Sequence, residues 1–331
     1  MSKIAVFGGG SWGTAFSTVL ADAGNDVTIW ARRQELADQI SAGRNDDYLP
    51  GLELSSSISG TTDPAEAVEG ADIVVLSVPS QSLRDNLAGW GDVLGDRIIV
   101  SLMKGVELGT TKRMSEVIAE AGGVPIERIA VVSGPNLAKE IVQRQPAATV
   151  IACPEESAAD RVAAAVATSY FRPYTSPDLV GAEVGGAVKN VIALAVGMAE
   201  GMGLGDNTKS SIITRGLAEM TRLGVALGAD ARTFAGLAGV GDLIATCMSP
   251  LSRNHSFGVG LGHGMTVAEV QEKTRQTAEG VKSCASIYEL ARDHDVDVPI
   301  IEQVNACVHH GVSVHDMVHA LLSRARKSET D

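Results

Sequence analysis

The sequence predicts an α/β protein in which a doubly wound parallel sheet is followed by an all-helical part. Three observations support this prediction. Short β-branched runs alternate with longer helix-like stretches over the first 180 residues. A glycine-rich turn directly follows the first run, and beyond residue 180 helical periodicity continues without a convincing strand. Such alternation is typical of parallel sheets that carry helices on both faces.

The strand candidates are continuous apolar runs rather than alternating ones. The run Ile-Val-Val-Leu at 73–76 is an example, and strands of this kind are buried on both faces. Several runs are followed at once by Gly, Pro or Ser, at the carboxyl ends where parallel sheets bind ligands. The candidates are residues 3–7, 26–30, 73–78, 97–102, 129–133, 149–152 and 170–174.

The character of the sequence changes near residue 175. Ser176 is a typical helix N-cap, and Pro177 suits the first helical position. We therefore expect two domains, a sheet-containing one over residues 1–180 and a helical one over residues 181–331. A glycine cluster at 258–264 follows no strand-like run, so we interpret it as a loop that connects helices.

Charge and composition limit the partners of the chain. Lys and Arg number 27 against 40 Asp and Glu, a formal net charge of −13. Nucleic acids and anionic membrane surfaces both need a basic face, so neither is expected as a partner. No signal-like or membrane-spanning run is visible, which favours a cytoplasmic protein without a membrane anchor. Because the four cysteines are far apart and His315 and His319 lack a companion glutamate motif, we expect neither disulfides nor a metal site.

The glycine-rich turn matches the dinucleotide-binding fingerprint of a Rossmann-like fold. Gly8, Gly10 and Gly13 form Gly-x-Gly-x-x-Gly between a strand candidate and a helix candidate. The first glycine permits the tight turn, the second lets the backbone approach a pyrophosphate, and the third lets helix and strand pack closely. The free N–H groups of the helix N-terminus then face the phosphates. A glycine-rich turn without a ligand is the alternative, and its place at the first strand-to-helix junction disfavours it.

The end of the second strand candidate indicates which cofactor is preferred. Enzymes specific for NAD usually place Asp or Glu there to accept the ribose 2′-hydroxyl, whereas arginine suits a 2′-phosphate. Here the strand runs into Arg32 and Arg33, with no carboxylate at its end. We therefore predict that NADP is preferred to NAD. The alternative interpretation is a pair of surface arginines at a helix start.

The helical part carries residues suited to proton transfer and phosphate binding. Lys189 lies in an almost wholly apolar stretch, where a lysine either snorkels to water or is desolvated with a lowered pKa. Asp242 follows a glycine pair that could aim its carboxylate into a cleft. Ser252, Arg253 and Asn254 together offer a hydroxyl, a guanidinium and an amide, a suitable receptor for a phosphate monoester. A helix cap and a solvated surface charge remain the alternatives for Asp242 and Arg253.

Taken in order, these motifs resemble those of the bacterial NAD(P)-dependent sn-glycerol-3-phosphate dehydrogenases over nearly the whole chain. The matching segments are Gly-Gly-Gly-Ser-Trp-Gly-Thr-Ala at 8–15, Tyr-Leu-Pro-Gly at 48–51, Met-Lys-Gly at 103–105, Ser-Gly-Pro-Asn-Leu-Ala-Lys-Glu at 133–140, Val-Lys-Asn at 188–190, Gly-Asp-Leu at 241–243, Ser-Arg-Asn at 252–254 and Ala-Glu-Gly at 278–280. One departure is Asn-Leu at 136–137, where the family often has Ser or Thr followed by Phe.

The resemblance implies interconversion of sn-glycerol 3-phosphate and dihydroxyacetone phosphate for phospholipid synthesis, by a homodimer. It implies that Lys189 is the general acid/base. The implied contacts to the phosphorylated substrate are Lys104, Gly134, Asn136, Lys189, Asp242, Ser252, Arg253 and Asn254. The implied contacts to the cofactor, besides Gly8, Gly10 and Gly13, are Ser11, Trp12, Arg32, Arg33, Tyr48, Lys104, Ala138, Arg253 and Glu279.

Two other functions remain compatible with the residues. One is a different NADP-linked hydroxyacid dehydrogenase of the same architecture, which would not require dihydroxyacetone phosphate. The other is a non-catalytic NADP sensor. A sensor has no need of Lys189, Asp242 and Arg253 together, so their presence disfavours it.

Overall fold

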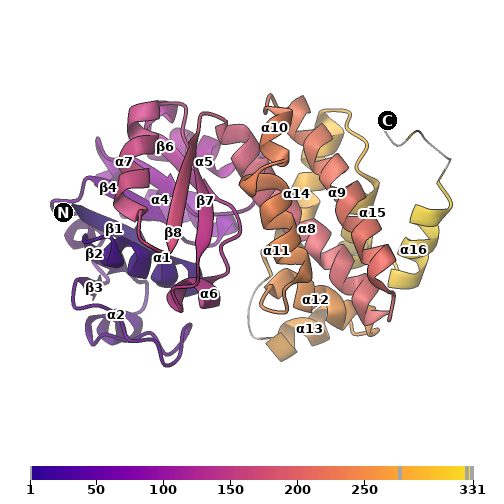
Figure 1. The fold of residues 1–331 in the computed structure, drawn as a ribbon, viewed down its shortest axis with the longest axis horizontal. Coiled ribbons are helices and arrows are strands. Elements are labelled where there is room, and N and C mark those ends of the chain that lie inside the picture. The colour runs from indigo at the N-terminus through magenta and orange to yellow at the C-terminus, as the bar shows by residue number, and fades with distance from the viewer. Residues whose placement is uncertain (1, 275–277, 325–327, 329–331) are drawn as a thin grey trace.

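A computed structural model describes residues 2–274, 278–324 and 328 of the chain (Figure 1). The first part contains one eight-stranded sheet with the order β3-β2-β1-β4-β5-β6-β7-β8. The strands are β1 (Lys3–Phe7), β2 (Asp26–Trp30), β3 (Ile58–Thr61), β4 (Ile73–Leu76), β5 (Ile98–Ser101), β6 (Ile129–Ser133), β7 (Ala147–Ala152) and β8 (Phe171–Ser176).

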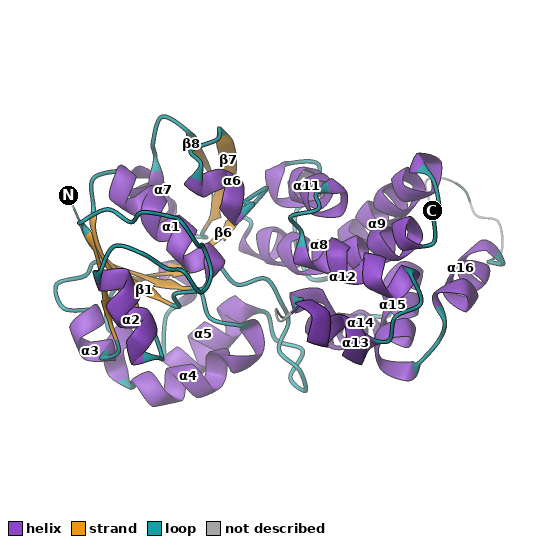
Figure 2. Ribbon diagram, turned by 90° about the horizontal axis from the view of Figure 1, so that it is seen from below, coloured by secondary structure: helices purple, strands orange, loops and turns teal. Residues whose placement is uncertain are grey.

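Helices cover both faces of the sheet, which explains why its strands are continuous apolar runs. In β1, Ile4 and Val6 pack into the core formed with α1, whereas Ala5 and Phe7 pack into the core formed with α4 and α5. Figure 2 shows α1 and α7 on one side of the sheet and α4 and α5 on the other. The helices of this part are α1 (Ser11–Asp22), α2 (Gln34–Ser41), α3 (Pro64–Ala67), α4 (Leu83–Trp90), α5 (Met114–Gly122), α6 (Ala138–Val142) and α7 (Glu156–Val166).

The second part is built around the long helix α8 (Leu179–Gly201), which is buried along nearly its whole length. By length and hydropathy α8 could cross a membrane, but 94% of its apolar window is buried inside the protein, as in a core helix. The helices around and beyond it are α9 (Asp206–Ala226), α10 (Ala231–Phe234), α11 (Asp242–Met248), α12 (Arg253–Gly262), α13 (Val267–Thr274), α14 (Glu279–Asp293), α15 (Pro299–His310) and α16 (Val314–Leu322).

The structure confirms the predicted fold class, a Rossmann-like sheet followed by helices, and corrects it in two places. The strand β3 was not predicted, because its four residues Ile-Ser-Gly-Thr carry no continuous apolar run. The strand β7 pairs antiparallel with β6, whereas a parallel sheet was predicted. A short connection carrying α6 returns the chain at this point, and antiparallel pairing needs no long crossover.

Two helix predictions were wrong in detail. The N-cap of α8 is Asp178, whose Oδ1 accepts a hydrogen bond from Gly181 N (2.9 Å), rather than Ser176. The glycine cluster at 258–264, predicted as a loop, lies mostly within α12. A Cβ at Gly258 would lie 2.2 Å from Leu194 O of α8. The glycines therefore allow two helices to touch backbone to backbone rather than forming a turn.

Candidate active site

The glycine-rich turn has the geometry that a bound dinucleotide requires. Gly8 has φ +123°, a value that favours glycine, and a Cβ there would lie 2.5 Å from Ser77 O. A Cβ at Gly13 would lie 2.0 Å from Gly8 O. In contrast, a Cβ at Gly10 would meet nothing within 4 Å, and Gly10 caps α1 without a side-chain hydrogen bond. The turn therefore offers open space and free N–H groups, which fits a pyrophosphate.

The two predicted arginines and the glycine-rich turn both follow the carboxyl ends of their strands. Trp30, the last residue of β2, pairs in register with Phe7 at the end of β1, so Arg32 and Arg33 follow directly at that edge. The Arg33 guanidinium forms an ion pair with Asp47. Arg32 and Arg33 therefore lie where a Rossmann-like fold binds the adenosine ribose of its cofactor.

Ser11, Trp12 and Tyr48 lie at the start of α1 and on the segment that returns after α2. The hydroxyl of Ser11, the first residue of α1, donates to Tyr48 O (3.4 Å). The indole N–H of Trp12 is buried and has no hydrogen-bond partner among the described residues. Buried donors are rarely left unsatisfied, so this one is available to a ligand.

A second group of predicted residues meets around one buried carboxylate. Lys189 lies in the middle of α8, and its ammonium donates to Asp242 Oδ1 and to Thr246 Oγ1 (2.9 Å). Lys104, from the segment after β5, donates to Asp242 Oδ2 (2.7 Å) and to Gly134 O (3.3 Å). The exposed fraction is 7% for the Lys189 side chain and 1% for that of Asp242. Each ammonium has three donors and uses two in these contacts.

The backbone before α11 aims Asp242 at the two lysines. A kinked turn, Leu237–Gly241, precedes Asp242, and within it Gly239 has the non-helical angles φ −104° and ψ −105°. A Cβ at Gly239 would lie 2.1 Å from Phe234 O, and one at Gly185 of α8 would lie 2.2 Å from the backbone of the turn. Gly239 and Gly185 thus allow the turn to meet α8 closely, which places the Asp242 carboxylate against α8.

Burial and neighbouring charges give Lys189 an unusual pKa. Burial lowers the pKa of Lys189 to about 7; the charge of Asp242 opposes this shift, and that of Lys104 adds to it. Burial raises the pKa of Asp242, but the charges of Lys104 and Lys189 outweigh it, so the pKa of Asp242 is lowered from its usual value. Asp242 therefore stays ionised while Lys189 can gain or lose a proton near neutral pH.

The N-terminus of α12 carries the predicted phosphate-binding residues. Ser252 is its N-cap, and its Oγ accepts a backbone N–H of the first turn (3.2 Å). Arg253 begins the helix and is exposed. The buried amide of Asn254 donates to Asn190 Oδ1 (2.9 Å) and accepts from Gly280 N (2.9 Å). Asn254 thus links α12 to α8, beside Lys189, and to the start of α14.

The remaining predicted residues lie at element ends. Glu279 begins α14, and its Oε2 accepts a hydrogen bond from Ser80 Oγ (2.8 Å), which connects the helical part to the end of β4. Asn136 donates from Nδ2 to Thr149 Oγ1 (3.1 Å), and its buried Oδ1 has no partner among the described residues. Ala138 is the first residue of α6.

The sequence reasoning missed two side chains of this site. Thr246 lies one helical turn after Asp242, so the spacing could have revealed that it shares a face with the carboxylate. Asn190 follows Lys189 directly in an apolar helix, and a second polar group there was itself a signal. Both residues contact predicted site residues through hydrogen bonds.

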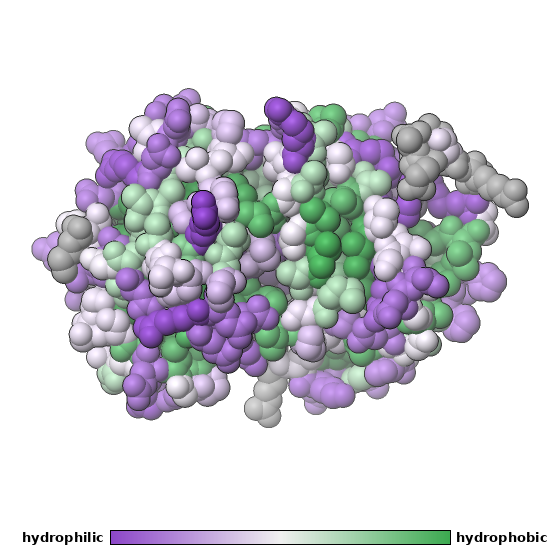
Figure 3. All heavy atoms as spheres, viewed as in Figure 1, coloured by the Kyte–Doolittle hydropathy of each residue, from purple (hydrophilic) through white to green (hydrophobic). Residues whose placement is uncertain are grey.

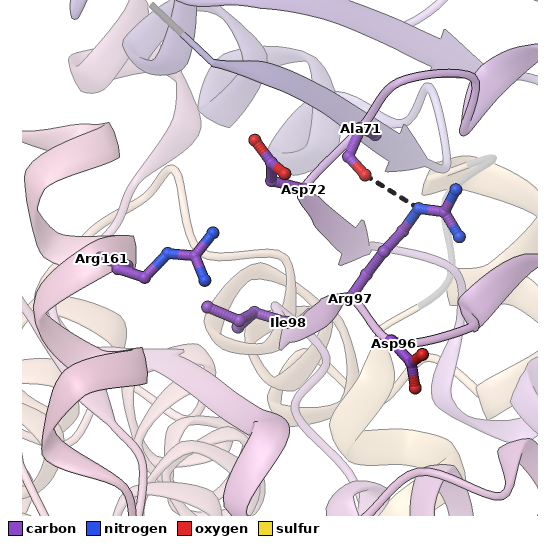
Figure 4. A pocket seen from close by; sticks show the side chains of 6 residues that line it. All are labelled: Ala71, Asp72, Asp96, Arg97, Ile98 and Arg161. Atoms are coloured by element: carbon purple, nitrogen blue, oxygen red, sulfur yellow. Dashed lines mark hydrogen bonds between the residues drawn. The ribbon is translucent and has the colours of Figure 1, made fainter.

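A separate surface hollow of about 360 Å³ lies at the amino-terminal ends of the strands, on the other side of the sheet from the glycine-rich turn (Figure 4). It is found where β4 and β5 begin, whereas open α/β sheets bind ligands at the carboxyl ends of their strands. Arg97 Nε donates to Ala71 O (2.9 Å) there. Its lining residues are Ala71, Asp72, Asp96, Arg97, Ile98 and Arg161. None of them was predicted as a site residue.

A dinucleotide fingerprint at the sheet edge, together with a buried lysine of lowered pKa, defines the class of nicotinamide-dependent dehydrogenases with a Rossmann-like fold. Within this class, the chain belongs to the NAD-dependent glycerol-3-phosphate dehydrogenase family. The family's N-terminal model matches residues 3–159, and its C-terminal model matches residues 178–319. The family inferred from the motifs is thereby confirmed.

Individual relatives support the assignment over the full length. The chain is 64% identical to a glycerol-3-phosphate dehydrogenase [NAD(P)+] of Streptomyces griseus over 99% of this chain and 98% of the relative. It is 58% identical to the protein of the same name from Thermobifida fusca, over 99% of both. Among solved structures, a glycerol-3-phosphate dehydrogenase from Coxiella burnetii is similar, with a TM-score of 0.93 and 33% identity over 98% of this chain and 99% of that one.

Proposed function

We propose that this chain interconverts sn-glycerol 3-phosphate and dihydroxyacetone phosphate as an NAD(P)-dependent dehydrogenase, with NADPH preferred, and so supplies the glycerol phosphate backbone of phospholipids. The family and its full-length relatives support the reaction and the cofactor class. The observation that carries the mechanism is the buried Lys189–Asp242–Lys104 cluster. The preference for NADPH rests on Arg32 and Arg33 at the end of β2.

Lys189 acts as the general acid/base in this proposal. When bound, the nicotinamide cofactor supplies or accepts the hydride. During reduction, negative charge grows on the substrate carbonyl oxygen, and the free N–H of the Lys189 ammonium stabilises that charge and then donates the proton. In the oxidation direction, neutral Lys189 accepts the hydroxyl proton. A pKa of about 7 suits both tasks at neutral pH.

Asp242 and Thr246 orient the Lys189 ammonium. Two of its three N–H bonds are taken by these side chains, so the third has one direction left. Lys104 reaches the same carboxylate from the sheet and keeps a donor for the substrate or cofactor. Gly134 and Asn136, whose Oδ1 has no partner in the described part of the chain, complete the substrate side from the segment after β6.

The start of α12 binds the phosphate of the substrate. Ser252 and Arg253 supply a hydroxyl and a guanidinium at a helix N-terminus, where free N–H groups also favour an anion. Asn254 contributes as substrate contact and as the link to Asn190. Binding energy from this remote phosphate positions the reacting carbon at Lys189.

The cofactor site comprises the turn at Gly8, Gly10 and Gly13 together with side chains on both parts of the chain. The side chains or backbone positions that we assign to it are Ser11, Trp12, Arg32, Arg33, Tyr48, Lys104, Ala138, Arg253 and Glu279. Trp12 supports this assignment because its indole N–H finds no acceptor among the residues that the structure describes, and Glu279 supports it through its hydrogen bond to Ser80 after β4.

The decisive experiment follows NADPH absorbance after dihydroxyacetone phosphate is added to the purified chain, and then repeats it with NADH. We expect rapid oxidation with both cofactors and a higher kcat/KM with NADPH. Oxidation only with a 2-keto acid would instead favour a hydroxyacid dehydrogenase. Tight NADPH binding without turnover of any ketone phosphate would favour a sensor.

Three further assignments belong to the same proposal. We place the domain boundary at residue 180, at the start of α8; the two family models separate between residues 159 and 178. We assign the chain to the cytoplasm.

We also assign a homodimer; apolar side chains exposed at Ile244, Met248 and Leu251 support it, and Figure 3 shows an apolar patch on the helical part. Light scattering of the purified chain tests the homodimer.

A further inference from the structure

The segment between α2 and β3 is fixed against the glycine-rich turn. Asn45 is fully buried, and its Nδ2 donates to Gly9 O (2.9 Å) and to Thr14 Oγ1 (2.8 Å). Three residues later, Tyr48 O accepts from Ser11 Oγ (3.4 Å). Asp47 lies between these two anchors. Its position beside the predicted cofactor site is therefore set by the fold.

The Asp47 carboxylate lies on the guanidinium that is predicted to bind a 2′-phosphate. Arg33 Nη2 donates to Asp47 Oδ2, and Gln39 Nε2 donates to Asp47 Oδ1 (3.2 Å). The hydrogen bonds from Arg33 and Gln39 hold the pKa of Asp47 below its usual value, so the group is an ionised acceptor. The strand β2 itself ends without a carboxylate, and Asp47 supplies one from a different segment.

We infer that Asp47 is a specificity-determining residue that lets this site accept NAD as well as NADP. The inference rests on the proposed function and adds a residue to its cofactor site. With NAD, Asp47 provides the acceptor for a ribose hydroxyl that Rossmann-like NAD sites normally place at the end of the second strand. With NADP, the 2′-phosphate takes the place of Asp47 on the Arg33 guanidinium.

The environment of the pair makes this exchange feasible. The exposed fraction is 49% for the Arg33 side chain and 31% for that of Asp47. Exposed ion pairs contribute little to stability because water and salt screen them. A phosphate dianion offers Arg33 a stronger partner than a carboxylate does. The charge of Asp47 then opposes that dianion, so the residue weakens NADP binding while it supports NAD binding.

The test measures binding of NADPH and NADH without substrate, by fluorescence titration of the wild-type chain and of Asp47→Asn. We expect the Kd for NADH to rise about five- to tenfold, because the neutral amide oxygen of Asn accepts a weaker hydrogen bond than the carboxylate does. We expect the Kd for NADPH to fall about two- to fivefold on loss of the opposing charge. The preference for NADPH should thus increase about tenfold or more.

The matched control is Asp46→Asn, which removes the same charge from the neighbouring position. Asp46 pairs with Arg44 Nη1 (2.8 Å), not with Arg33, so the ratio of the two Kd values should change less than about twofold. An equal change in both variants, or an unchanged or lowered preference for NADPH in Asp47→Asn, would overturn the inference. The proposed reaction fails separately, if wild-type chain binds both cofactors but does not reduce dihydroxyacetone phosphate.

Discussion

The two ends of the proposed site contain the same kinds of charge in opposite surroundings. At the cofactor end, Arg33 and Asp47 form a pair whose side chains are 49% and 31% exposed. At the substrate end, Lys189 and Asp242 are 7% and 1% exposed. Only the buried pair gives its cation a pKa near neutrality. Burial thus gives the lysine of one ion pair a pKa suited to proton transfer, whereas exposure leaves the arginine of the other pair free to exchange its carboxylate for a ligand.

The largest effect should follow removal of the buried cation. Lys189→Ala should lower kcat about 10²–10⁴-fold, because the charge on the carbonyl oxygen would lose its proton donor. Binding of NADPH, measured by fluorescence, should change little. Lys282→Ala, an exposed lysine on α14, is the control and should keep wild-type kcat. A Lys189→Ala variant with near-normal turnover would remove the acid/base assignment.

The next largest effect should come from an exposed cation that binds phosphate. Arg253→Ala should raise KM for dihydroxyacetone phosphate about 10- to 100-fold, since a charged hydrogen bond to the phosphate is lost, and should affect kcat less. Steady-state kinetics at saturating NADPH measure both constants. If KM stays at the wild-type value, Arg253 does not bind the phosphate of the substrate, and other residues recognise it.

The pH profile tests the buried cluster directly. Reduction needs protonated Lys189, so kcat/KM for dihydroxyacetone phosphate should decline as pH rises through about 7, and oxidation of glycerol 3-phosphate should increase. Because the charge of Asp242 raises the pKa of Lys189, Asp242→Asn should shift the decline in reduction and the rise in oxidation to lower pH by about one unit. A decline or rise that stays in place would mean that another group titrates.

The smallest effect concerns the stability of the protein, which should depend on Asp242 but not on Asp47. Asp242→Asn leaves two lysines around a neutral group and should lower the free energy of unfolding by about 3 kcal/mol, since loss of one partner of a buried pair is costly. Asp47→Asn should not change the Tm measurably, because water solvates the freed Arg33. Thermal unfolding followed by circular dichroism compares the variants at one pH. Equal losses of Tm would contradict the contrast between the two ends.

The sequence predicted those features in which local pattern and tertiary structure agree. Apolar runs such as residues 3–7 and 129–133 became β1 and β6 with unchanged bounds, because both faces of a central strand need apolar residues. The strand β3 lies at the edge of the sheet and is half-exposed, so Ser and Gly are tolerated and the apolar signal is lost. The direction of β7 depends on its connection, which periodicity does not report.

The site was predicted to a similar degree and for similar reasons. Residue types singled out Lys189 and Asp242 as candidates, since a charge in an apolar helix and a carboxylate after glycines are unusual, and the structure brings the two together. The pairing of Lys104 with Asp242 joins positions 138 residues apart, and no local pattern encodes such a contact. Asp47 carries no local signal either, because it lies on the segment after α2 and only the fold brings it to Arg33 at the end of β2.

The backbone contact between α8 and α12 has a consequence for the arrangement of the proposed site. Lys189 lies on one of these helices and Arg253 begins the other, so the contact between the helices sets how far apart their backbones lie. A methyl group at Gly258 or Gly197 would lie 2.2 Å or 2.1 Å from a main-chain oxygen of the opposite helix and would force the pair apart. The missing side chains at Gly197 and Gly258 thus hold the helix that carries Lys189 directly against the helix that begins at Arg253.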